Sequence, residues 1–104
     1  MAQVTVDAGI CGFTTRIQTA SEDMQTVQFH YESDCPHVNE AKSELVSVNA
    51  FQELFKKPHE TSVYRVLSKH LPHVTCPLYS GFLKAIEVTA GLALPKNAAI
   101  SIDK

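Results

Sequence analysis

The sequence predicts one α+β domain in which an N-terminal antiparallel sheet is followed by several helices and a short C-terminal strand. Residues 4–32 alternate apolar and polar side chains, which is typical of half-buried strands. Residues 36–91 instead space apolar side chains three and four positions apart, as amphipathic helices do. The chain has 104 residues, 44% of them hydrophobic, which is enough for one core and predicts a single domain over residues 1–104.

The N-terminal third contains the predicted strands. Val4 and Val6 alternate with polar neighbours, and residues 12–32 are expected to form a β-hairpin that turns at residues 21–23. The expected buried face of this hairpin carries Phe13, Thr15, Ile17, Thr19, Val27, Phe29 and Tyr31.

Four helices are expected after Pro36. The first buries Val38, Ala41 and Leu45. Asn49 is a good N-cap for the second, and Thr61 or Ser62 for the third, which Pro72 ends. The apolar stripe of the second helix, which we expect in the core, comprises Phe51, Leu54 and Phe55.

The fourth helix is expected to begin at Pro77 and to end at Gly91, because proline favours the first helical turn and glycine the residue after the last. Pro95 then leads into a predicted closing strand around residues 99–102.

Composition limits the classes of function. A net charge of -2 without a basic stripe gives no reason to expect nucleic acid as a partner. No segment approaches the roughly 18 apolar residues of a membrane span, and the start of the chain lacks a secretory signal pattern. We therefore expect a cytoplasmic protein with no membrane partner. Three cysteines, an odd number, favour reduced thiols over disulfides.

Two cysteines, Cys35 and Cys76, each precede a proline that is expected to open a helix. Proline pushes the residue before it out of the helical region, so each cysteine is predicted at an N-cap. The unpaired N–H groups there would stabilise a thiolate and lower the pKa of the thiol.

Two further residues complete a candidate metal site. Cys11 lies between Gly9-Ile10 and Gly12 at a predicted bend, and His73 stands three residues before Cys76. Cys11, Cys35, Cys76 and His73 together form a Cys3His set, which suits tetrahedral zinc. His37, directly after Cys35-Pro36, is the competing nitrogen ligand.

Alternatives to zinc remain open. The same soft ligands could hold an iron–sulfur cluster. Cys35 or Cys76 could instead be the nucleophile of a thiol or redox enzyme, with a histidine as base. The three cysteines could also be small buried apolar residues of a structural or interaction domain. Surface or turn roles are expected for His30, His59, His70, Asp7 and Asp34.

The motifs G-x-C-G at residues 9–12, D-C-P-H at 34–37 and H-x-x-C-P at 73–77 resemble those of a small uncharacterised prokaryotic family of domains of unknown function. That resemblance implies that the cysteines act as a set, and it implies no reaction. More distantly, Cys76-Pro77 is similar to the cysteine and proline of the TSCPD domain, which is appended to some ribonucleotide reductases.

Overall fold

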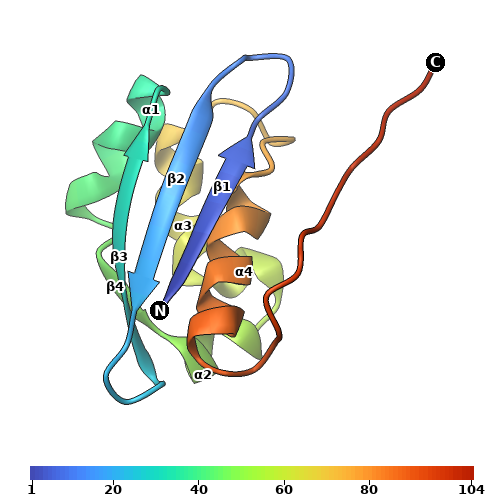
Figure 1. Ribbon diagram of the computed structural model, residues 1–104. Helices are drawn as coiled ribbons and strands as arrows, with labels where there is room; N and C mark the ends of the chain where they lie inside the picture. Colours follow the sequence, from blue (N-terminus) through green and yellow to red (C-terminus); the bar gives the residue numbers. More distant parts are fainter.

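The computed structural model describes residues 1–104. The helices pack against one four-stranded sheet (Figure 1). In chain order the elements are β1 (Ala2–Asp7), β2 (Thr14–Ala20), β3 (Thr26–Ser33), α1 (Pro36–Glu40), η1 (Ala41–Ser43), β4 (Ser47–Asn49), α2 (Ala50–Leu54), η2 (Pro58–Glu60), α3 (Ser62–His70) and α4 (Leu78–Thr89). The predicted α+β class is confirmed.

The strands follow chain order, β1-β2-β3-β4, and every neighbouring pair is antiparallel. The register places Ile17 opposite both Val4 of β1 and Tyr31 of β3. The predicted hairpin is therefore present with the predicted buried face. The sequence patterns did not indicate β4, a three-residue strand whose Val48 pairs with Val27.

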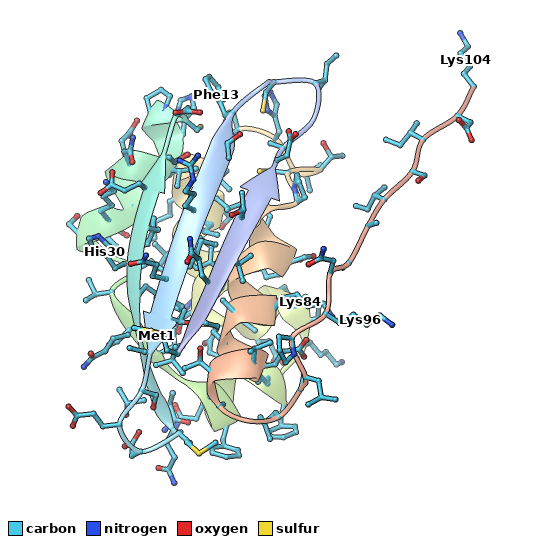
Figure 2. The ribbon with its side chains drawn as sticks, viewed as in Figure 1. Met1, Phe13, His30, Lys84, Lys96 and Lys104 are labelled. Carbon is cyan, nitrogen blue, oxygen red and sulfur yellow. The ribbon has the colours of Figure 1, made fainter.

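All helices lie on one face of the sheet, and the other face is open to solvent (Figure 1). Phe82 of α4 is fully buried at the centre of the covered face. Its ring meets the rings of Phe29 and Tyr31 edge-on, with centroids 5.2 and 4.9 Å away. The open face is polar and includes His30 of β3, labelled in Figure 2.

The helix ends follow the predicted capping chemistry. The Asn49 side chain accepts hydrogen bonds from the N–H groups of Phe51 and Gln52, and Thr61 accepts one from Tyr64. Gly91 has a φ of 76°, a conformation that side-chain-bearing residues rarely adopt, directly after the end of α4. No helix is long and apolar enough to cross a bilayer.

The expected core stripe of α2 is wrong. Phe51 is 42% exposed and Phe55 74% exposed, and only Leu54 packs partly against the core. The buried side chains of this short helix are Ala50 and Glu53. Glu53 turns inward because its carboxylate accepts the free N–H groups of Ser62 and Val63 at the start of α3 (2.7 and 3.2 Å).

The predicted C-terminal strand is absent from this structure. Residues 94–104 form no helix or strand and extend away from the body, with Lys104 at the far end (Figure 2). The pattern of residues 99–102 predicted a strand, but no strand of the same chain lies beside this segment to pair with it.

Candidate cysteine pocket

One cavity of about 130 Å³ lies where three connections meet: the β1–β2 loop, the β3–α1 junction and the α3–α4 junction. Its lining contains all three cysteines and both histidines singled out in the sequence. The lining residues are Val6, Ala8, Cys11, Phe13, Thr15, Cys35, His37, Val38, Leu71, Pro72, His73, Cys76 and Leu78. The structure thus gathers residues that stand far apart in the chain.

Cys11 stands at the tip of a tight loop between β1 and β2. Gly9 and Gly12 both have positive φ, 87° and 76°, so this bend requires glycine at both positions. Asp7 accepts the Gly9 N–H through Oδ1 (3.1 Å), which is the turn role expected for this carboxylate. Cys11 itself is exposed and free.

Cys35 is the N-cap of α1, as predicted. Its backbone is extended (φ -81°, ψ 119°), and Pro36 occupies the first turn. Its N–H donates to Ser33 Oγ (3.0 Å), and that hydroxyl also hydrogen-bonds Thr15. The thiol is partly buried and packs against the core.

Cys76 departs from the predicted N-cap position. Pro77, with a helical backbone (φ -71°, ψ -3°), is the N-cap of α4, so Cys76 lies one residue further out. Its N–H donates to the carbonyl of His73 (3.3 Å) across a turn. This turn sets the backbone of Cys76 and places His73 and Cys76 on the same short connection.

The environment of Cys76 also reverses the expected change in its acidity. Burial raises the pKa of the thiol, the Leu78 N–H lowers it by less, and the neighbouring Cys11 and Cys35 raise it again. The expected lowering of the Cys76 pKa is therefore wrong.

The two candidate histidines differ in their partners. His37 Nδ1 lies 3.6 Å from Glu40 Oε1, one turn along α1. His73 has no side-chain hydrogen bond or ion pair, and it is an exposed residue of the cavity lining. Outside the pocket, His70 lies 3.2 Å from Glu44 and 3.8 Å from Glu40, and its side chain is only 17% exposed, so it is less of a surface residue than expected.

Apolar side chains form most of the cavity wall, and Leu71 and Leu78 are buried within it. The sequence analysis did not link these two leucines to the cysteines. The link depends on the α3–α4 connection, which no periodicity reveals. No carboxylate lines the cavity, and Asp34, next to Cys35, accepts a hydrogen bond from the Thr14 N–H (3.3 Å).

The thiols and imidazoles converge without forming a finished coordination shell. No group of three histidine, cysteine, aspartate or glutamate side chains is arranged to hold a metal ion as it stands. Coordination here would require side chains to move, and Cys11 is the most exposed of the three cysteines.

Comparison with known proteins gives a family. The model of a family of unknown function, DUF6951, matches residues 2–102. The chain belongs to this family. No curated protein and no solved structure matches the chain. Membership agrees with the predicted uncharacterised domain and assigns no activity, so function must be argued from the pocket.

Proposed function

We propose that this domain binds a metal ion, with zinc the preferred ion, through Cys11, Cys35 and Cys76. The observation that carries the proposal is that three separate connections bring all three cysteines of the chain to one small cavity. Cysteines that served only as small apolar residues would have no reason to line the same cavity. Three thiolates and one imidazole form a recognised tetrahedral zinc set.

The raised pKa of Cys76 is compatible with this role. A metal binds the thiolate, so zinc would displace the thiol proton and metal uptake would release protons. The apolar wall would then exclude water and strengthen the attraction between ion and thiolates. Zinc–sulfur bonds of about 2.3 Å would require the three sulfur atoms to move closer together than they stand in this structure.

His73 is the preferred fourth ligand. It is joined to Cys76 by a backbone hydrogen bond and has no competing side-chain partner, whereas His37 faces Glu40. An iron–sulfur cluster would use the same cysteines and leave either histidine free. The similarity to the TSCPD domain, based on Cys76-Pro77, stays a prediction.

A second candidate is a thiol redox protein. It is favoured by three free thiols that line one cavity and could reduce a substrate disulfide by exchange. One thiolate would attack the substrate disulfide and release one substrate thiol, and a second cysteine would then resolve the mixed disulfide and release the other. Cys35 would be the attacking thiol, because the raised pKa of Cys76 disfavours its thiolate. The odd number of cysteines, with no disulfide among them, supports a cytoplasmic location for either function.

Elemental analysis of protein purified with and without oxygen tests the proposal. We expect about one zinc per chain in both preparations, and loss of zinc in Cys11→Ser, Cys35→Ser and Cys76→Ser but not in the control His59→Ala. Colour and iron only in the anaerobic protein would indicate a cluster. Protein that contains no metal and takes up no added zinc would refute the proposal and leave the redox candidate, tested by disulfide exchange.

A further inference from the structure

The segment after α4 is extended and unpaired. The N–H groups of Leu92 and Ala93 still donate to the Glu87 carbonyl, but residues 94–104 make no backbone or side-chain hydrogen bond. Ile100 and Ile102 are 80% and 88% exposed, and they alternate with Ser101 and Asp103. Such alternation of apolar and polar side chains is typical of a half-buried strand, but this segment belongs to no sheet.

The sheet has an open edge that suits such a strand. Ala8 donates to Phe13 across the β1–β2 pair, so the regular antiparallel register directs the backbone groups of residues 2, 4, 6 and 8 toward β2. The N–H and C=O groups of Gln3, Thr5 and Asp7 consequently point away from the sheet. No other strand lies beyond β1.

This edge lacks the features that usually block strand addition. β1 has the sequence AQVTVD, with no proline, lysine or bulge, and it pairs without interruption over six residues. The opposite edge, β4, is only three residues long. An open edge of six residues is long enough to accept residues 99–103.

β1 and residues 99–103 also match in how they alternate apolar and polar side chains between their two faces. β1 turns the partly buried Val4 and Val6 toward α4 and its polar residues toward solvent. A strand added beside it with Ile100 and Ile102 on the helix side would extend the valine row, and Ser101 and Asp103 would join the polar face. The opposite placement would expose both isoleucines.

We propose that residues 99–103 add as a fifth strand to the β1 edge of a second copy of this chain, in a reciprocal exchange. In its own chain the segment leaves the lower end of α4 and diverges from β1 (Figure 1). Each copy has one free strand and one free edge. A two-fold pair therefore satisfies both and leaves neither exposed.

The mass of the full chain in solution, measured by light scattering over a wide concentration range, tests the proposal. We expect twice the 11.4 kDa of one chain. Thr5→Pro removes only an outward N–H and should give a monomer, while the control Thr5→Val should remain a dimer. Ile100→Asp combined with Ile102→Asp should also give a monomer, and the control Ser101→Asp should not.

The isoleucine variants keep the test valid if proline disturbs β1, because residues 99–103 make no hydrogen bond to the body. Circular dichroism verifies that each variant is folded. A wild-type monomer at every concentration, a dimer that survives the double aspartate substitution, or slow amide exchange of residues 99–103 in a monomer would each overturn the proposal.

Discussion

At the scale of single residues, the two Cys-Pro pairs show how well a rule about neighbouring residues predicts the N-cap of a helix. The rule that proline excludes its predecessor from the helix placed Cys35 correctly at an N-cap. Cys76 also lies outside its helix, but Pro77 is itself the N-cap of α4, so the expectation that proline takes the first helical position failed there. The turn from His73 to Cys76 fixes that backbone, and burial determines the acidity of the thiol. Neither the turn nor the burial can be predicted from the dipeptide Cys76-Pro77 alone.

The thiol of Cys76 should react more slowly than that of Cys11 in metal-free protein near pH 7. Burial raises the Cys76 pKa above its ordinary value of 9.0, so less thiolate is present, and its rate should keep rising at pH values above 9. Alkylation with iodoacetamide, followed by peptide mass spectrometry at several pH values, measures both rates. A Cys76 rate equal to or above that of Cys11 at pH 7 would contradict this expectation.

The choice of histidine ligand is also decided at single residues. His73→Ala should weaken zinc retention by about 10-fold or more, since loss of even a supporting residue can cost this much. His37→Ala should change retention little, because its ring faces Glu40. Competition with a chromophoric chelator measures both variants. Loss of zinc from His37→Ala alone would reverse the assignment.

At the scale of elements, capping and alternation were sufficient signals for most boundaries. Asn49, Thr61 and Gly91 mark helix ends because their chemistry is local. The short strand β4 was missed because its pairing depends on β3 rather than on its own pattern. The α2 stripe was misread because Glu53 takes the inward position in order to cap α3.

Helix α4 packs tightly on β1 at Gly81. A Cβ atom at this position would collide with Val6 Cγ2, and the branched Val6 side chain has little freedom to move aside. Gly81→Ala should therefore destabilise the protein by about 1–3 kcal/mol.

The same substitution should have the opposite sign in a Val6→Ala background. With the collision removed, alanine gains up to about 1 kcal/mol over glycine in a helix. Urea unfolding of the four proteins of this double-mutant cycle measures the coupling. Equal effects of Gly81→Ala in both backgrounds would show that the contact with Val6 does not limit the packing of α4.

At the scale of the whole molecule, the sequence motifs indicated that the cysteines form a set, and the fold brings them to one cavity. The distances between them could not be predicted. They depend on how the sheet register and the packing of α3 and α4 bring three connections to the same place. The buried Leu71 and Leu78 join the site only through that packing.

Zinc should raise the thermal stability of the whole domain. An ion present at 100 times its dissociation constant stabilises the folded state by about 2.7 kcal/mol. For a domain of this size that corresponds to a rise in melting temperature of roughly 10 °C. Calorimetry with added zinc and with excess chelator measures the difference. A variant with all three cysteines replaced by serine should have the same melting temperature with zinc as with chelator. If the wild-type protein also melts at the same temperature under both conditions, tight zinc binding is excluded.

The origin of the pocket in three separate connections has a consequence for how such sites are recognised. A knuckle with paired cysteines is a linear signature that can be found by spacing and transplanted as a peptide. Here the connections that carry Cys11, Cys35 and Cys76 are separated by strands and helices, so no short peptide contains the complete set. The site is inherited only with the entire fold, and relatives that share it would be recognised by matching three-dimensional positions, even where insertions have changed every interval between the cysteines.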